Sequence, residues 1–250
     1  MTAIDLTLLQ RARHLVDEAR SIAVLTGAGM SAESGVPTFR HAQRGLWVQY
    51  SPQVLASLEG WRRDPGVAWG WYLWRMAGVR AAQPNAGHRA LAEAAKTRDI
   101  TLVTQNVDDL HERAGSRDVL HLHGDLFAHR CFACAHPFDD VILPGIAAEP
   151  VPVEPPRCPH CNDRIRPGVV WFGEDLPVAP YRAAVEAAER CDLMLVIGTA
   201  GLVYPAAGLP ALARQRGARI IEINPEETGL SPLADVCLRG GAAAAVPALF

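Results

Sequence analysis

The sequence has a single lysine, no net positive charge and no long apolar run, and each absence limits what the protein can do. Lys96 is the only lysine among 24 basic residues, so the chain offers a single lysine of its own for modification. The formal charge of −3 creates no basic field, and we therefore expect no direct nucleic-acid ligand. No run approaches the ~20 apolar residues of a membrane span, and the first residues lack the apolar core of a signal peptide. We expect a cytoplasmic protein with no membrane partner.

What the chain does contain is enough apolar sequence for a large core. With 49% hydrophobic residues in 250, it can fold as one domain with insertions or as two lobes. Short apolar runs alternate with helical segments, at 21–27, 99–104, 118–122, 192–198 and 218–223. Because strands that alternate with helices form parallel sheets covered on both faces, this order predicts an α/β fold.

Two segments interrupt the alternation, and we interpret them as insertions that pack into a small lobe. Residues 41–84 are rich in Trp and Arg, and the spacing of their apolar residues predicts a helical insertion. Residues 126–166 carry paired cysteines and six prolines from Pro137 to Pro156, which excludes a long regular element. The sheet domain then consists of residues 1–40, 85–125 and 167–250.

Four of the six cysteines occur as two Cys-x-x-Cys pairs. Cys131 and Cys134 form the first pair, and Cys158 and Cys161 form the second, with 23 residues between the pairs. Each pair presents two thiolates from a tight turn, and four thiolates complete a tetrahedral zinc shell. A closed shell leaves no open position for substrate, so we predict one structural Zn²⁺. Free thiols, or His136 or His160 in place of one cysteine ligand, remain alternatives.

A glycine-rich turn follows the first apolar run. Gly27-Ala28-Gly29-Met30-Ser31-Ala32 fits the pattern in which glycines let backbone N–H groups approach a pyrophosphate. No acidic residue at the end of a second strand follows about twenty residues later, so a dehydrogenase is disfavoured. A tight turn that binds nothing is the alternative.

Five motifs occur in the order that one known family shows. They are Gly27–Arg40, Thr104–Asp108 followed by Leu110-His111, His121–Gly124, the two cysteine pairs and Gly198–Gly201. On these residues the chain resembles the sirtuins, the NAD-dependent protein-lysine deacylases, from about residue 20 to residue 242. The resemblance implies a Rossmann-like NAD-binding domain, a zinc-containing small lobe, NAD as a consumed co-substrate and acylated lysine in peptides or proteins as substrate. The oligomeric state is left open, with a monomer among the alternatives.

The resemblance assigns the catalytic base to His123, the histidine directly before a glycine. An imidazole suits this role because its ordinary pKa of ~6.5 lets it accept a proton near neutral pH. Asp108 could instead be a helix cap. The other residues expected to act in catalysis are Asn106, Asp108 and Arg40.

The residues expected to contact NAD lie in the turn after the first strand and at the ends of later strands. The first group is Gly27, Ala28, Gly29, Ser31, Ala32, Glu33, Thr38, Phe39, Arg40 and Trp47. The second is Gln105, Asn106, Val107, Asp108 and His123, and the third is Gly198, Thr199, Ala200, Asn224, Pro225, Glu226 and Ala242. Asp109 stands where the family pattern usually has glycine, and Ala200 stands where it usually has serine.

Two further features of the resemblance concern the acylated substrate. The peptide-accepting segment is Val169, Val170, Trp171, Phe172, Gly173 and Glu174, where an extended strand can pair its backbone with a peptide. A core-facing strand is the alternative. Tyr72 and Arg75 share one helix face and match the Tyr-x-x-Arg pair of sirtuins that remove succinyl and malonyl groups. The Arg would bind a distal carboxylate bidentately and the Tyr would add a hydroxyl, unless Arg75 is only a surface residue.

The implied reaction transfers an acyl group from lysine to the ADP-ribose part of NAD. The acyl oxygen attacks as nicotinamide leaves through an oxocarbenium-like state. His123 then deprotonates a ribose hydroxyl, which attacks the resulting imidate carbon, and water completes the hydrolysis. Phe39 would shield the reactive carbon. The products are nicotinamide, free lysine and O-acyl-ADP-ribose. The alternatives are mono-ADP-ribosyl transfer from the same pocket, deacetylation without acidic-acyl preference, and NAD sensing without catalysis.

Overall fold

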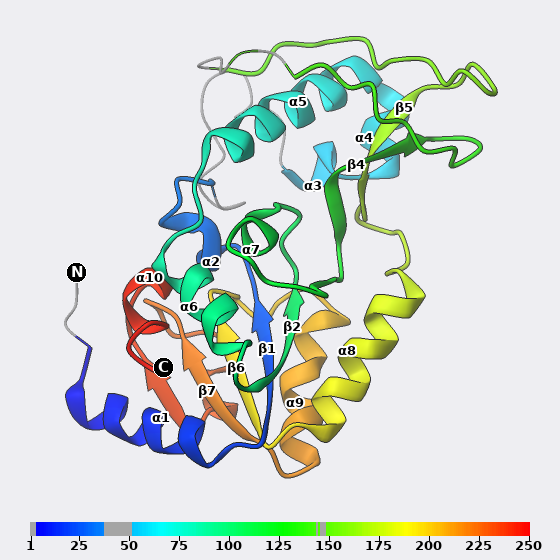
Figure 1. Ribbon diagram of the computed structural model, residues 1–250. Helices are drawn as coiled ribbons and strands as arrows, with labels where there is room; N and C mark the ends of the chain where they lie inside the picture. Colours follow the sequence, from blue (N-terminus) through cyan, green and yellow to red (C-terminus); the bar gives the residue numbers. More distant parts are fainter. Residues whose placement is uncertain (1–3, 38–51, 144, 146–148) are drawn as a thin grey trace. The chain divides into compact units, whose positions relative to one another are not determined.

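The computed structural model describes residues 4–37, 52–143, 145 and 149–250. These residues belong to two compact units, whose elements are labelled in Figure 1. Unit 1 comprises Met1–Gly35, Gln83–Leu122 and Pro177–Phe250, and unit 2 comprises Val36–Ala82 and His123–Leu176. Within the described residues, no helix combines the length and apolar character that crossing a membrane requires.

Unit 1 is built on a six-stranded parallel sheet with the order β3-β2-β1-β6-β7-β8. The strands are β1 (Ser21–Thr26), β2 (Asp99–Thr104), β3 (Leu120–His121), β6 (Leu193–Ile197), β7 (Arg219–Ile223) and β8 (Val236–Leu238). The chain extends the sheet from β1 through β2 and β3, and then places β6 on the other side of β1. The carboxyl ends of β1, β2 and β6 therefore meet at a switch point, where open α/β sheets bind ligands.

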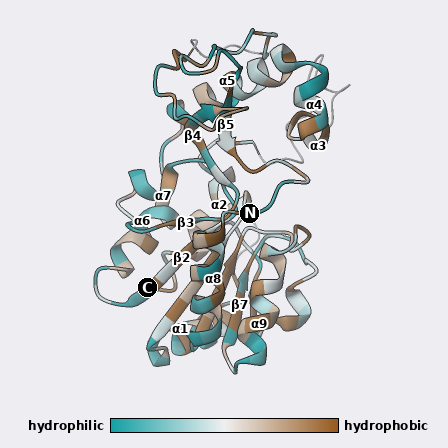
Figure 2. Cartoon of the chain, turned by 90° about the vertical axis from the view of Figure 1, so that its right-hand side faces the viewer, coloured by the Kyte–Doolittle hydropathy of each residue, from teal (hydrophilic) through white to brown (hydrophobic). Residues whose placement is uncertain are grey.

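Helices cover both faces of this sheet. One face packs against α1 (Leu6–Glu18), α6 (Ala86–Ala94) and α10 (Ala242–Ala245), and the other against α8 (Val178–Arg190) and α9 (Leu209–Gln215). Two short helices, α2 (Gly29–Ala32) and α7 (Leu110–Arg113), come after β1 and β2. Polar and apolar residues both occur on α1, α6, α8 and α9, whereas the strands are mainly apolar (Figure 2).

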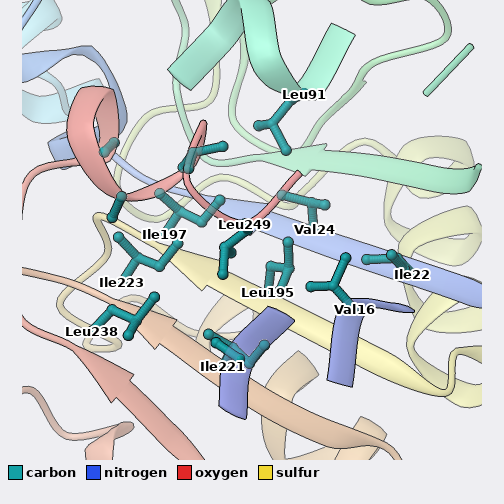
Figure 3. Packing of buried hydrophobic residues seen from close by; sticks show 14 of the residues in the cluster. Val16, Ile22, Val24, Leu91, Leu195, Ile197, Ile221, Ile223, Leu238 and Leu249 are labelled. Atoms are coloured by element: carbon teal, nitrogen blue, oxygen red, sulfur yellow. The ribbon is translucent and has the colours of Figure 1, made fainter. Parts of the chain in front are cut away.

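The core of unit 1 follows from the alternation of side chains along each strand. Ile22 and Val24 of β1 pack in one cluster with Val16 of α1 and Leu195 of β6 (Figure 3). Ala23 and Leu25, which alternate with them along β1, are buried on the opposite face. Because both faces are covered, the strands appear in the sequence as continuous apolar runs.

Unit 2 combines a helical segment with a two-stranded antiparallel ribbon. Its elements are α3 (Pro52–Leu55), α4 (Leu58–Arg63), α5 (Pro65–Ala81), β4 (Gly124–Cys131) and β5 (Ile165–Val169). Asp64 caps α5 by accepting the backbone N–H of Val67 at 3.0 Å. The rings of Trp61, Phe132 and Trp171 form the aromatic part of its core, with centroids 5.3–6.3 Å apart.

The predicted α/β fold with a parallel sheet and an additional small lobe is confirmed, but two features were not predicted. One is β8, a short edge strand. The other is the pairing of β5 with β4, which places residues 167–176 in unit 2, whereas the sequence analysis assigned them to the sheet domain. Pro167 and Gly168 lie inside β5, and these residues weaken any strand signal in the sequence.

Candidate active site

The glycine turn after β1 packs directly on the loop after β6. The N–H of Gly29 donates to the carbonyl of Gly198 at 2.8 Å, and the N–H of Gly27 donates to that of Ile197 at 2.9 Å. A Cβ on Gly198, whose φ is +63°, would lie 2.5 Å from backbone atoms of Gly29 and Met30. Two motifs far apart in the sequence thus pack backbone to backbone, which requires glycine at these positions.

Asn106 follows β2 and is held through three of its groups. Its N–H donates to Thr104 Oγ1 at 3.0 Å, and its Nδ2 donates to the Gly27 carbonyl at 3.1 Å and to Ser31 Oγ at 3.2 Å. Its carbonyl accepts from the His121 ring at 3.1 Å. Because Nδ2 faces the glycine turn, Oδ1 faces the other way and can accept from a carboxamide N–H or a ribose hydroxyl.

Three strand ends are linked by side-chain hydrogen bonds. Gln105 Nε2, after β2, donates to Thr199 Oγ1, after β6, at 2.9 Å. Asn224 Nδ2, after β7, donates to the Thr199 carbonyl at 3.1 Å. The structure therefore brings together predicted NAD contacts from the carboxyl ends of β2, β6 and β7.

The loop after β7 is anchored by Glu222, which the sequence analysis missed. Glu222 is 1% exposed and accepts from Ser231 Oγ at 2.6 Å, from Arg239 Nη1 at 2.6 Å and from the Thr228 hydroxyl. Burial alone would raise the pKa of Glu222, but these hydrogen bonds outweigh it and hold the pKa below its usual range. A glutamate inside the apolar run 219–223 was the available signal.

The same network holds the predicted NAD contacts that follow β7. Arg239 Nη1 also donates to the Glu226 carbonyl at 3.0 Å, and the N–H of Glu226 donates to Asn224 Oδ1 at 3.3 Å. At the start of α10, Glu33 Oε2 accepts the N–H of Ala243 at 2.7 Å, next to the buried Ala242. Glu33 therefore has a structural contact in addition to its predicted role.

Asp108 is buried and linked to Ser31. It is 5% exposed, and its carboxylate accepts from the N–H of Leu110 at 3.2 Å and from the Ser31 hydroxyl. Burial raises the pKa of Asp108, and the neighbouring Asp109 carboxylate adds to that rise. Asp109 itself has a φ of −100°, so this position does not need the left-handed backbone that favours glycine. Its carboxylate lies 3.5 Å from the Arg113 guanidinium.

We expect Asp108→Asn to stabilise the protein at neutral pH. A carboxyl whose native pKa is raised contributes stability below its unfolded pKa, and this contribution is lost as pH rises through the native pKa. The amide carries no buried charge, so its Tm should exceed the wild-type Tm by about 2–4 °C near neutral pH. Thermal denaturation should show a smaller difference near about pH 4. An Asn variant less stable than wild type at neutral pH would contradict this assignment.

His123 is half-buried at the start of unit 2. Its carbonyl accepts the N–H of Val170 at 2.8 Å, which ties the predicted base to the predicted peptide segment. Gly124 follows with a φ of +76°, and a Cβ there would lie 2.1 Å from the Gly168 carbonyl. Only glycine fits this position, which gives the His-Gly dipeptide a physical basis.

Gly124→Ala is therefore expected to destabilise unit 2 by about 3 kcal/mol or more, through a left-handed backbone and a backbone clash. Chemical denaturation measures this loss. Gly173→Ala is the matched control, because Gly173 also has a positive φ (+89°) but a Cβ there would meet nothing within 4 Å. Equal losses in the two variants would show that the close approach to Gly168 is unimportant.

The four paired cysteines converge in unit 2. Their sulfur atoms all lie within 4.8 Å of one another, with Cys131 and Cys161 3.3 Å apart and Cys134 and Cys158 3.7 Å apart. Zn–S bonds of ~2.3 Å place tetrahedral sulfurs ~3.8 Å apart, so the cluster fits one zinc ion. The predicted zinc ligand set is confirmed, and cysteines fill all four positions.

The end of β5 and the loop that follows it, residues 166–174, are closed by an ion pair. Arg166 Nη1 and Nη2 lie 2.5 and 2.8 Å from the two carboxylate oxygens of Glu174, and the guanidinium carbon lies 3.4 Å from the Trp171 ring centroid. Glu174 also accepts the N–H of Trp171 at 2.8 Å. Trp171 and Glu174 are thus engaged within the loop, whereas Phe172 is 45% exposed.

The N–H groups of this loop are used internally. Val170 donates to His123, as described above, and Phe172 donates to the Ala56 carbonyl at 2.8 Å. A peptide that pairs with Val170 or Phe172 must therefore donate its own N–H groups to carbonyl groups of this segment. Val169, by contrast, is buried in β5 opposite Gly124.

Comparison with known proteins places this chain in one family. Residues 27–205 match the model described as the Sir2 family. The chain belongs to the Sir2 family. An NAD-dependent protein deacylase of Mycolicibacterium paratuberculosis is 54% identical over 229 residues, which cover 92% of this chain and 96% of that protein.

Solved Sir2 structures resemble the whole chain. A crystal structure of a Sir2 homologue–NAD complex has a TM-score of 0.87 at 46% identity, covering 99% of this chain and 93% of that one. A structure titled Sir2–p53 peptide–NAD⁺ has a TM-score of 0.81 at 31% identity, with 94% of each chain covered.

Four predicted residues of this Sir2-family chain lie outside the described residues, namely Thr38, Phe39, Arg40 and Trp47. The remaining predicted NAD contacts in unit 1 follow β1, β2, β6 and β7, or begin α10. Ala28 and Ala32 flank the residues of the glycine turn described above, Val107 lies between Asn106 and Asp108, and Ala200 and Pro225 follow Thr199 and Asn224. His123 lies in unit 2.

Proposed function

We propose that this Sir2-family chain removes succinyl and malonyl groups, as well as acetyl, from lysine side chains of proteins. It is an NAD-dependent protein deacylase, as its family and its curated relatives at 53–54% identity indicate. The proposed acidic-acyl specificity rests on Tyr72 and Arg75 of α5. The observation that carries it is the orientation of the Tyr72 hydroxyl.

The Tyr72 hydroxyl is buried and oriented by one hydrogen bond. Tyr72 is 1% exposed, and its Oη accepts from Trp171 Nε1 at 2.9 Å. This contact uses an oxygen lone pair, so the hydroxyl proton can be donated to a second partner, for which a carboxylate is a strong acceptor. Burial raises the pKa of Tyr72 to about 12 even though the Arg75 charge opposes the rise, so the proton is retained at neutral pH.

Arg75 supplies positive charge one helical turn further on. Its guanidinium carbon lies 4.8 Å from the Trp71 ring centroid and 6.0 Å from that of Tyr72. Stacking on an aromatic face orients the plane of a guanidinium, which then presents a fork suited to a carboxylate. A phenol hydroxyl and a guanidinium on one helix face suit a succinyl or malonyl terminus better than an acetyl methyl group.

We assign the roles of the other site residues from the family motifs to which they belong. The glycine surface formed by the turn after β1 and the loop after β6 would hold the pyrophosphate of NAD. Asn106 would offer Oδ1 to the carboxamide or a ribose hydroxyl, and Asp108 would provide charge near it. His123 would act as general base toward a ribose hydroxyl. NAD, when bound, would supply the electrophilic ribose carbon for attack by the acyl oxygen.

A panel of peptides tests this proposal. Acetyl-, succinyl- and long-chain-acyl-lysine peptides are incubated with and without NAD, and the products are identified by mass spectrometry. NAD-dependent loss of succinyl with release of O-succinyl-ADP-ribose supports the proposal. Removal of acetyl groups alone would refute the proposed role of Tyr72 and Arg75 and leave the deacylase assignment standing. ADP-ribose found on an acceptor protein without acyl loss would favour ADP-ribosyl transfer.

A further inference from the structure

The ring of His121 lies between two groups that can only accept hydrogen bonds. His121 ends β3, and its Nδ1 is 3.1 Å from the carbonyl oxygen of Asn106. Its Nε2 is 2.7 Å from Glu112 Oε1 on α7. The side chain of His121 is 18% exposed and that of Glu112 is 42% exposed. All three residues belong to unit 1.

These partners determine the charge of the ring. A carbonyl and a carboxylate both lack a proton to give, so each ring nitrogen must donate. A neutral imidazole carries only one N–H, and only the imidazolium carries two. Since carboxyl groups ordinarily hold their proton far less tightly than imidazole does, the extra proton belongs on the ring.

Asn106 is the group that gains from this arrangement. The bonds from its N–H and its Nδ2 already direct it toward Thr104, Gly27 and Ser31. The contact from His121 fixes the carbonyl, the remaining backbone group. A neutral ring would turn a lone pair toward either Asn106 or Glu112, and one of the two contacts would be lost.

Other ionisable groups near His121 come from the surrounding elements. Asp108, after β2, interacts favourably with a positive charge on His121. The same positive charge repels a proton on His111 of α7 and so lowers the pKa of His111. In the parallel register His121 lies opposite Thr104 of β2. The buried positions of α8, which also packs on β3, are all alanines. Among the residues that the structure describes, Glu112 is the carboxylate placed in direct contact with the ring.

We propose that His121 is a positioning residue that holds Asn106 as an imidazolium, with Glu112 as its counter-ion. Cofactor binding then weakens as the pH rises and the ring loses its proton. This inference rests on the proposed function through the role of Asn106 in NAD binding.

Two pairs of variants separate this role from a merely structural one. In His121→Asn the amide nitrogen takes the place of Nδ1 and still donates to Asn106, whereas in His121→Gln it takes the place of Nε2 and reaches only Glu112. In Glu112→Gln the new amide can donate to a neutral ring, so the hydrogen bonds no longer need the extra proton. Lys96→Gln, at a distant exposed ion pair with Glu93, is the control.

The test measures ADP-ribose binding by calorimetry from about pH 6 to about pH 9, the range in which imidazole titrates. Wild type and the Lys96 control should bind roughly three- to tenfold more weakly at the alkaline end, the size of one lost hydrogen bond. His121→Asn and Glu112→Gln should bind ADP-ribose at every pH with the affinity that wild type has at about pH 6, and this affinity should not fall as the pH rises. His121→Gln should bind weakly throughout.

Nitrogen-15 NMR of the histidine rings, with His121→Asn used for assignment, reports the ring directly. Both His121 nitrogens should have imidazolium shifts near neutral pH in wild type. A neutral ring, or the same alkaline loss in Glu112→Gln, would overturn the inference and leave the proposed function standing. Absence of ADP-ribose binding at every pH would instead refute the proposed NAD site.

Discussion

Arg75→Met is expected to lower kcat/KM for a succinyl-lysine peptide by about 100-fold or more. The substitution keeps an unbranched apolar stem on α5 and removes the charged fork, so a desolvated carboxylate would lose its counter-ion. The acetyl-lysine peptide carries no such carboxylate, and its kcat/KM should change by less than about threefold. Steady-state kinetics on both peptides with saturating NAD measure the ratio.

Arg80→Met is the matched control for that experiment. Arg80 lies on the same helix, and its guanidinium carbon lies 4.0 Å from the Phe127 ring centroid. Its loss should leave the succinyl-to-acetyl ratio unchanged. Equal falls on both peptides in Arg75→Met would mean that Arg75 supports unit 2 as a whole, and the acidic-acyl proposal would fail. Tyr72→Phe is a poorer test, because it also deprives Trp171 Nε1 of its acceptor.

Cys158→Ser is expected to remove zinc and unfold unit 2. Structural zinc sites bind with about 10–16 kcal/mol of free energy, and this energy contributes directly to folding. Cys158 is buried, and the described residues of the proline-rich segment before it form no helix or long strand, so a bound metal would replace secondary structure there. Metal analysis should fall from about one zinc per chain to near zero, and deacylation should fall by about 100-fold or more.

Cys237→Ser is the control for zinc loss. Cys237 lies in β8 of unit 1 and is half-buried, with its sulfur 3.9 Å from the Ser231 carbonyl. It should keep about one zinc per chain and near wild-type activity. A Cys158→Ser protein that retains stoichiometric zinc, or full activity without zinc, would contradict a structural four-thiolate site.

Much of the fold and several sites could be predicted because their signals are local in the sequence. The four zinc ligands occur as two Cys-x-x-Cys pairs, and the short spacing brings the two cysteines of each pair together. Only the approach of one pair to the other depends on the fold. The glycine turn and the apolar strands are likewise local patterns. The β4–β5 ribbon could not be predicted in the same way. Pro167 and Gly168 weaken the strand signal of β5, and residues 132–164 separate β5 from its partner strand.

The residues that sequence reasoning missed are polar groups whose partners come from other elements. Glu222 is held by Ser231 and Arg239, up to 17 residues away, and His121 is held by Glu112 and by the carbonyl of Asn106. A sequence shows that such residues are polar. It does not show which of their atoms are already occupied.

The sequence by itself determined the family, the order of the NAD motifs, the zinc ligands and the position of the histidine assigned as base, because covalent spacing places those residue types. Only the tertiary structure decided where the protons and lone pairs point. Packing of α5 against the loop 166–174 turns the Tyr72 lone pair to Trp171, and packing of β3 and α7 leaves His121 between two acceptors. Hydrogen-bond direction depends on partners brought together by folding, so spacing along the chain cannot determine it.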